Sequence, residues 1–171
     1  FDAVVMACHA PTSLSLIDAH EDEKQVLGGF RCQPNEAILH TDRALLPRRE
    51  KIWSAWNYLS STGLSGQRPV AVSYLLNKLQ PLPFKTPVIV TLNPHRRPDP
   101  AQVIQTFDYE HPVMDVPAMQ SQRQLANIQG VRRTWFCGAW AGYGFHEDGL
   151  KSALRVVLDM GISPPWSAVY D

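Results

Sequence analysis

The sequence predicts an α+β fold in which an antiparallel sheet with helices is flanked by two pieces of one α/β domain. Short runs that alternate apolar and polar residues, separated by prolines, fill the middle of the chain, as half-buried antiparallel strands do. Each end instead joins an apolar run to an amphipathic helical pattern, and the two ends resemble each other more than either resembles the middle. We therefore predict one domain made of 1–27 and 128–171, with a second domain of 28–127 inserted into it.

The opening run Phe1–Ala7 is apolar on both faces, which is typical of a strand in the middle of a buried sheet. Part of that sheet is expected to lie outside this sequence. Residues 11–27 predict one helix that ends at Gly28, with the acidic run Glu21–Glu23 on its wet side. The apolar positions of this helix are Leu14, Leu16, Ile17 and Val26.

The middle of the chain predicts five strands, a short helix and a polar loop. The alternation in the second strand puts Trp56 and Tyr58 on one face and Asn57 on the other. The predicted strands are 37–41, 53–58, 70–74, 87–92 and 105–109, the helix is 75–79 and the loop is 60–66.

The last part of the chain predicts helix 117–128 with Met119, Leu125 and Ile128 buried, a buried strand 135–137 and a final helix 147–160. The apolar face of that final helix is Leu150, Ala153, Leu154, Val157 and Leu158.

Three glycines, Gly138, Gly142 and Gly144, lie between that strand and the final helix. Glycine lets main-chain N–H groups approach a ligand closely, and a helix begins with a positive end. The turn therefore predicts a site for an anionic or carbonyl-rich cofactor. A tight turn that binds nothing is the alternative.

Composition excludes several classes of protein. Sixteen basic and sixteen acidic residues cancel, so no charge pattern for nucleic acid or anionic lipid is present. The absence of a signal peptide and of an apolar run of roughly 18 residues predicts no membrane span and a cytoplasmic location. Three cysteines and six histidines show no metal-ligand spacing, so no metal site is predicted, and Cys8 and Cys137 are expected to serve as small core residues.

Two segments resemble the flavin-containing amine oxidase superfamily: Phe1–Ala7 resembles one of its strands, and 136–153 resembles its C-terminal flavin segment. A bacterial subgroup described as predicted NAD/FAD-binding proteins is similar over further stretches spread along almost the whole chain. These are Gly142–Leu150, Leu39–Asp42, Leu46–Arg49, Trp56–Tyr58 and Tyr109–Pro112.

The resemblance implies an FAD-dependent oxidoreductase that oxidises a C–N or C–C bond of a small-molecule substrate by hydride transfer to the flavin. It makes 1–27 and 128–171 parts of the FAD-binding domain and 28–127 the substrate-binding domain. Gly138 would lie beside the pyrophosphate and ribityl chain, and the helix start at 146–149 would face the pyrimidine end of the ring. The implied cofactor-binding residues are Ala7, Cys8, Gly138, Ala139, Gly144, Phe145, His146, Glu147, Asp148, Gly149 and Leu150.

For some residues the resemblance leaves an alternative open. Trp56 and Tyr58 would line the substrate cavity, or would only pack on the sheet. His146 would contact the cofactor, or would only begin the helix. No catalytic residue is assigned. The basic pairs Arg48–Arg49 and Arg96–Arg97 are expected to be solvated loop charges, with a substrate carboxylate as their alternative ligand.

The sequence also departs from the family. Ala139 replaces an acidic residue, and Ala153 replaces the glycine of a serine-glycine pair. The Gly-x-Gly-x-x-Gly turn that binds the ADP half is absent. We therefore expect this chain to be the C-terminal portion of a longer flavoprotein, partnered by an N-terminal segment that carries the fingerprint, and inactive alone. A non-catalytic α+β interaction module that has lost the cofactor is the rival; a serine hydrolase is excluded because Gly63–Gly66 lacks the nucleophile-elbow pattern.

Overall fold

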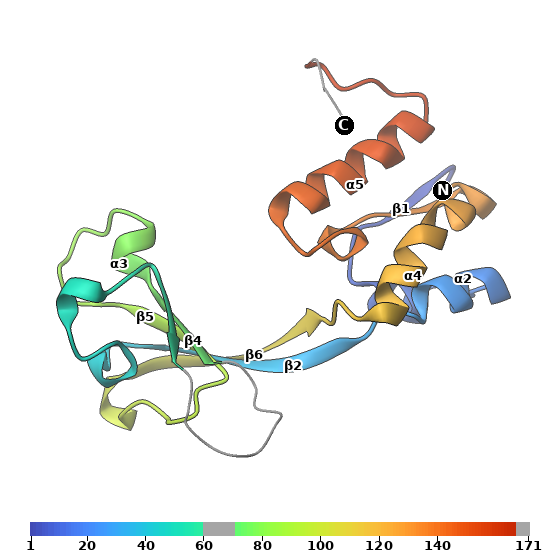
Figure 1. The fold of residues 1–171 in the computed structure, drawn as a ribbon. Coiled ribbons are helices and arrows are strands. Elements are labelled where there is room, and N and C mark those ends of the chain that lie inside the picture. Colours follow the sequence, from blue (N-terminus) through green and yellow to red (C-terminus); the bar gives the residue numbers. More distant parts are fainter. Residues whose placement is uncertain (60–70, 167–171) are drawn as a thin grey trace. The chain divides into compact units, whose positions relative to one another are not determined.

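The computed structural model describes residues 1–59 and 71–166, and the predicted loop 60–66 and the first residue of strand 70–74 lie outside them (Figure 1). The fold is of the predicted α+β class. It contains a parallel pair of strands, β1 and β7, and a five-stranded sheet in the order β3-β4-β5-β2-β6. The chain divides into two compact units: unit 1 is 1–33 with 111–171, and unit 2 is 34–110.

Unit 1 surrounds one hydrophobic core. Leu27, Ile128 and Phe136 are almost completely buried in it, and the rings of Phe30 and Trp140 meet edge to face at 4.6 Å. The elements of unit 1 are β1 (Val4–Met6), α1 (Ala10–Leu16), α2 (Glu21–Leu27), α4 (Val116–Gln124), η4 (Leu125–Ile128), η5 (Val131–Arg133), β7 (Thr134–Phe136), η6 (Ala139–Ala141) and α5 (His146–Asp159).

The single helix predicted for 11–27 is wrong, because Ile17 has extended backbone angles and separates α1 from α2. Leu16 is accordingly exposed rather than in the core. The acidic run Glu21–Glu23 is not wholly exposed to solvent either. Glu23 is buried, and its carboxylate accepts a hydrogen bond of 2.8 Å from the amide of His20 at the start of α2, with Arg132 at 3.7 Å.

Other burial predictions for unit 1 are partly wrong. Leu125 and Ile128 are buried as predicted, but the last turn of that helix is 3₁₀, and Met119 is exposed. The buried residues of α5 are Ser152, Leu154 and Val156, so the buried stripe includes a serine that the apolar pattern missed. Some apolar side chains of the predicted first strand and final helix are exposed in this chain: Val4 and Val5 of β1, and Leu150 and Leu158 of α5.

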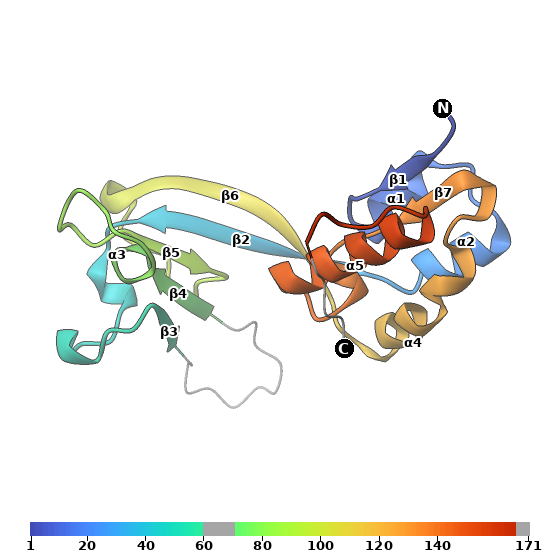
Figure 2. The same cartoon turned by 90° about the horizontal axis from the view of Figure 1, so that it is seen from above.

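Unit 2 carries most of the large sheet, whose strands lie side by side in Figure 2. Trp53, predicted in a strand, precedes β3 and packs on the cluster of Leu46, Leu75 and Ile89, while its Nε1–H donates to the carbonyl of Pro47 at 2.7 Å. The elements are β2 (Cys32–His40), η1 (Arg43–Leu45), η2 (Glu50–Ile52), β3 (Trp56–Leu59), β4 (Ala71–Leu75), α3 (Leu76–Leu79), β5 (Ile89–Leu92), η3 (Pro100–Gln102) and β6 (Val103–Pro112).

Candidate functional site

Unit 1 brings two predicted site segments together at one edge of its parallel pair. Val4 pairs with Thr134 and Met6 with Phe136, and the amide of Cys137 donates to the carbonyl of Met6 at 3.0 Å. Because the strands are parallel, their carboxyl ends share an edge, where ligands of α/β proteins bind. Ala7–Cys8 and Cys137–Gly138 therefore leave the sheet next to each other, at the ends of the two strands labelled β1 and β7 in Figure 2.

Trp140 fastens the glycine-rich turn to the end of β1. Its ring is buried, and its Nε1–H donates to the carbonyl of Cys8 at 3.0 Å. The turn continues as η6, in which the amides of Gly142 and Gly144 both donate to the carbonyl of Ala139 at 3.1 Å. These bonds hold the turn in one conformation directly before α5.

Ser152, on the buried face of α5, fixes the helix to the same turn. Its hydroxyl accepts from the amide of Gly138 at 2.9 Å and lies 3.1 Å from the Gly138 carbonyl and 2.8 Å from the Gly149 carbonyl. The main-chain N–H of Gly138 is therefore already used, which the family pattern did not predict.

The first turn of α5 has donors that remain available. The Asp148 carboxylate accepts from the amides of Tyr143 at 3.1 Å and Phe145 at 3.0 Å. Within the described part of the chain, the amides of His146, Glu147 and Asp148 have no acceptor. Since Glu147 and Asp148 already place negative charge here, this end suits a neutral carbonyl oxygen better than a phosphate.

The glycines test whether the turn leaves room for a cofactor. Gly138 has φ +155°, and a Cβ on it would lie 2.4 Å from Trp140 Nε1, so the chain itself requires this glycine. Gly144 has φ +92°, and a Cβ there would meet no described heavy atom closer than Met114 Cε at 3.6 Å. The space at Gly144 and the free amides of α5 fit a flat ligand with carbonyl groups, whereas Gly138 is enclosed on its Cβ side.

All the predicted cofactor-binding residues belong to unit 1. The structure brings Ala7 and Cys8 beside the turn that leads into α5, and the roles of these residues toward a cofactor stay predictions. The exposed ones are Ala7, Gly144, Phe145, His146, Glu147 and Leu150; the half-buried ones are Cys8, Gly138, Ala139, Asp148 and Gly149.

The two predicted core cysteines lie near this edge. Burial, with a smaller contribution from the neighbouring Cys8, raises the pKa of the buried Cys137 thiol, which favours its neutral form. Cys8 is half-buried, with its Sγ 3.3 Å from the Ser13 hydroxyl. The raised pKa of Cys137 argues against a nucleophilic thiolate.

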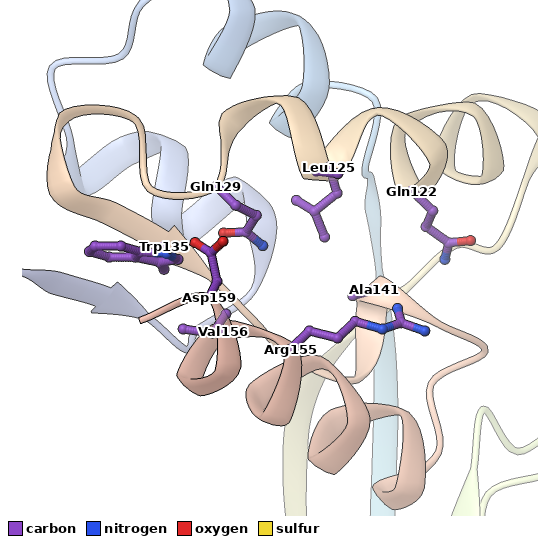
Figure 3. A pocket seen from close by; sticks show the side chains of 9 residues that line it. Gln122, Leu125, Gln129, Trp135, Ala141, Arg155, Val156 and Asp159 are labelled. Atoms are coloured by element: carbon purple, nitrogen blue, oxygen red, sulfur yellow. Dashed lines mark hydrogen bonds between the residues drawn. The ribbon is translucent and has the colours of Figure 1, made fainter. Parts of the chain in front are cut away.

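Sequence reasoning missed an open cavity of about 260 Å³ in unit 1 (Figure 3). Leu125, Trp135 and Val156 contribute to its wall, and Asp159 accepts a hydrogen bond of 2.6 Å from the indole N–H of Trp135. Arg155 lies on α5, as Val156 and Asp159 do, and also lines the cavity. None of the predicted cofactor-binding residues lines it, so this cavity and the strand-edge site are separate features.

In unit 2 the predicted substrate residues lie on the outer face of β3. Trp56 is 62% exposed and Tyr58 is 64% exposed, whereas Asn57 is buried, as the alternation predicted. Trp56 pairs across the strands with Tyr74, their rings 5.4 Å apart, and Tyr58 pairs with Val72. By register, the same face continues through Val90, Leu92 and Leu39, all half-buried.

The covered face of the same sheet carries a row of polar side chains, which sequence reasoning did not find. The Thr91 hydroxyl lies 2.8 Å from both the Ser73 hydroxyl and Nε2 of His40, and all three residues are buried. The amide of Asn57 extends the row by donating to the Ser73 carbonyl at 3.3 Å. Because each polar side chain of this row has a hydrogen-bond partner, its burial costs little free energy.

Comparison with known proteins supports the fold only. No protein-family model matches the sequence, and no curated protein is significantly similar to it. Among solved structures, the chain is similar to a CLA-producing fatty acid isomerase from P. acnes, with a TM-score of 0.57 and 15% identity over 94% of this chain. The chain spans only 42% of the length of that structure. No helix in the described residues is both long and apolar enough to cross a bilayer.

Proposed function

We propose that this chain is part of an FAD-dependent oxidoreductase of the amine oxidase type, in which unit 1 binds FAD and unit 2 binds a small-molecule substrate. The observation that carries the proposal is the shared carboxyl edge of β1 and β7, where Ala7–Cys8 lie beside the glycine-rich turn that leads into α5. The proposed N-terminal segment with the dinucleotide fingerprint would supply the ADP half of the site.

The residues present fit one part of the cofactor better than another. The amides of His146, Glu147 and Asp148 would donate to a neutral carbonyl such as those of the flavin pyrimidine ring. Gly138 would shape the site rather than donate a hydrogen bond to the cofactor, because its amide N–H already donates to the Ser152 hydroxyl. When bound, FAD supplies the two-electron acceptor for a hydride from a C–N or C–C bond.

The fold comparison is compatible with an enzyme. The similar structure is a CLA-producing fatty acid isomerase, and by analogy we propose that this chain also belongs to an enzyme that acts on a small organic molecule. The activity of the whole protein is part of the proposal, because the chain spans less than half of that structure.

One observation favours the rival function, a non-catalytic module without cofactor. Many of the hydrogen bonds that hold the turn are made within the chain, by the side chains of Trp140, Asp148 and Ser152. A module that had lost its ligand would keep such contacts for stability alone. The two functions differ in whether the strand edge binds FAD.

Paired charge substitutions on one strand test the proposal. Ala7 and Ala3 are both exposed, but Ala7 follows the carboxyl end of β1 and Ala3 precedes its amino end. We expect full-length protein to bind FAD, and Ala7→Glu to weaken that binding about tenfold by repelling the pyrophosphate. Ala3→Glu should bind FAD as the unchanged protein does. The measurement is titration with FAD, followed by flavin absorbance and fluorescence.

Full-length protein that takes up no FAD would leave the non-catalytic module as the function. FAD binding that is equally insensitive to both substitutions would move the cofactor away from this edge.

A further inference from the structure

The open cavity of unit 1 is bordered by two glutamine side chains that bind main-chain groups. Gln122, on α4, donates to the carbonyls of Trp140 at 2.9 Å and Gly142 at 2.7 Å. Gln129, directly after η4, donates to the carbonyl of Phe136 at 2.7 Å and accepts from its amide at 2.8 Å. Both glutamines line the cavity. These four hydrogen bonds tie α4 and η4 to β7 and the turn after it, so the cavity is a fixed feature of unit 1.

Much of the cavity wall is apolar. Leu125 and Val156 are buried side chains of this wall, and Ala126 and Ala141 contribute only a methyl group each, which leaves space. An apolar group gains about 25 cal/mol for each Å² that it buries against such a wall, whereas a polar group there would lose water without gaining a partner. The volume of about 260 Å³ is below the about 300–1,000 Å³ of sites for drug-sized ligands. The cavity therefore suits a small molecule with an apolar body.

Arg155 gives the cavity a positive charge that the chain itself does not neutralise. Asp159 lies one helical turn further on, at a spacing that allows an ion pair, but its carboxylate accepts from the Trp135 indole instead. In Figure 3 the side chain of Arg155 extends toward Ala141 and away from Asp159. Among the described residues, Arg155 has no ion pair and no hydrogen bond.

This guanidinium limits the charge of the ligand. Arg can donate two parallel hydrogen bonds to a carboxylate, and such charged pairs are stronger than neutral ones. The negative charge of Asp159 elsewhere in the cavity disfavours a second carboxylate on the same ligand. The complementary molecule therefore carries one carboxylate.

We propose that this cavity binds a small monocarboxylate with an apolar body, whose carboxylate pairs with Arg155 and whose body packs against Leu125 and Val156. The site is additional to the proposed FAD site, because none of the predicted cofactor-binding residues lines the cavity. The inference therefore does not rest on the proposed function.

Binding of 4-fluorobenzoate to full-length protein tests the proposal. This probe joins one carboxylate to one ring, and its fluorine NMR signal reports binding. We expect saturable binding of the probe and binding about tenfold weaker for 4-fluorobenzamide, which keeps the ring but has no charge. Arg155→Gln should weaken probe binding about tenfold, because it removes the charged donor.

Two matched controls separate the cavity from general surface effects. Arg123 is also an exposed arginine on a helix of unit 1 but does not line the cavity, so Arg123→Gln should bind the probe normally. Ala126→Phe should fill the cavity and abolish probe binding. Asn127→Phe places the same ring on the next residue, which is exposed and outside the lining, and should keep probe binding.

Several outcomes would overturn the inference: no saturable probe binding, equal binding of 4-fluorobenzamide, equal loss in Arg123→Gln, or unchanged binding in Ala126→Phe. Titration of the same preparations with FAD keeps the two proposals distinguishable. FAD uptake without probe binding would overturn the inference alone, and probe binding without FAD uptake would overturn the proposed function alone.

Discussion

His40 shows how one buried side chain ties the stability of unit 2 to pH. The amide of Asp42 donates to its Nδ1 at 3.1 Å, so Nδ1 carries no proton, and Nε2–H is left to donate to Thr91. Burial lowers the pKa of His40 below its ordinary 6.5, against a smaller opposing effect of the Asp42 charge. Protonation would set two N–H groups against each other at Nδ1.

We predict that the free energy of unfolding of unit 2 falls as the pH drops below about 6.5. Between the lowered pKa of folded His40 and the value 6.5, the unfolded chain binds a proton that the folded chain does not, so acid favours unfolding. The slope from this residue approaches about 1.4 kcal/mol per pH unit. Urea unfolding across pH measures it.

Exposed His95 supplies the control for that measurement. His40→Gln should remove this part of the pH dependence, and His95→Gln should keep it. If the unfolding free energy of His40→Gln keeps the same slope against pH, another group causes that slope.

At the residue scale, the sequence predicted alternation well and buried polarity poorly. Trp56, Asn57 and Tyr58 fall on the predicted faces, because strand geometry fixes a period of two. The burial of Ser152 was missed because its partner Gly138 is distant in sequence, and that of Glu23 was missed because a distant residue, Arg132, accompanies its local bond to the His20 amide. Local patterns carry no information on such partners.

At the scale of elements, the turn from β7 to α5 depends on Gly138. Its backbone, with φ +155° and ψ 166°, lies in a region used almost only by glycine, and a Cβ would collide with the buried Trp140 ring. The glycine therefore holds the turn against β1 whether or not a ligand binds.

We predict that Gly138→Ala lowers the free energy of unfolding of unit 1 by at least about 2 kcal/mol, through backbone strain and displacement of Trp140. Gly161→Ala is the matched comparison: Gly161 also has positive φ, +77°, but no described atom lies within 4 Å of its Cβ position. Gly161→Ala should lower the free energy of unfolding by about 1 kcal/mol. Thermal unfolding monitored by tryptophan fluorescence compares them, and equal costs would show that contact with Trp140 is unimportant.

Most strands and helices were predictable from sequence, but their ends and breaks were not. β5, α3 and α5 begin and end within two residues of the predicted ranges. The break at Ile17 and the 3₁₀ turn after α4 were missed, because packing rather than propensity decides them. At the candidate site, the sequence predicted the turn and the start of α5; the contacts of Trp140 and Ser152 required the three-dimensional structure.

At the scale of the whole molecule, the two units have separate hydrophobic clusters. Phe136 lies at the centre of one and Ile89 in the other, and both side chains are completely buried. Strands β2 and β6 each contain a boundary between the units, so the chain crosses from one to the other within regular structure.

We predict that small core substitutions act on one unit at a time. Phe136→Leu should lower amide protection in unit 1, and Ile89→Val in unit 2, each by about 1 kcal/mol of opening free energy, because neither side chain contributes to the other cluster. Hydrogen exchange with mass spectrometry resolves the two. Matching loss of protection in both units from either substitution would mean that they unfold together.

Because residues 1–33 belong with 111–171, unit 1 is discontinuous in sequence, and this shapes how it assembles during synthesis. Residues 1–33 are synthesised before the 77 residues (34–110) that separate them from the rest of this unit. Joining the ends of an unstructured loop of that length costs about 4 kcal/mol. Early pairing of β2 with β6 would offset that entropy cost before residues 111–171 join unit 1. Folding of unit 2 would therefore assist the folding of unit 1, into whose sequence it is inserted.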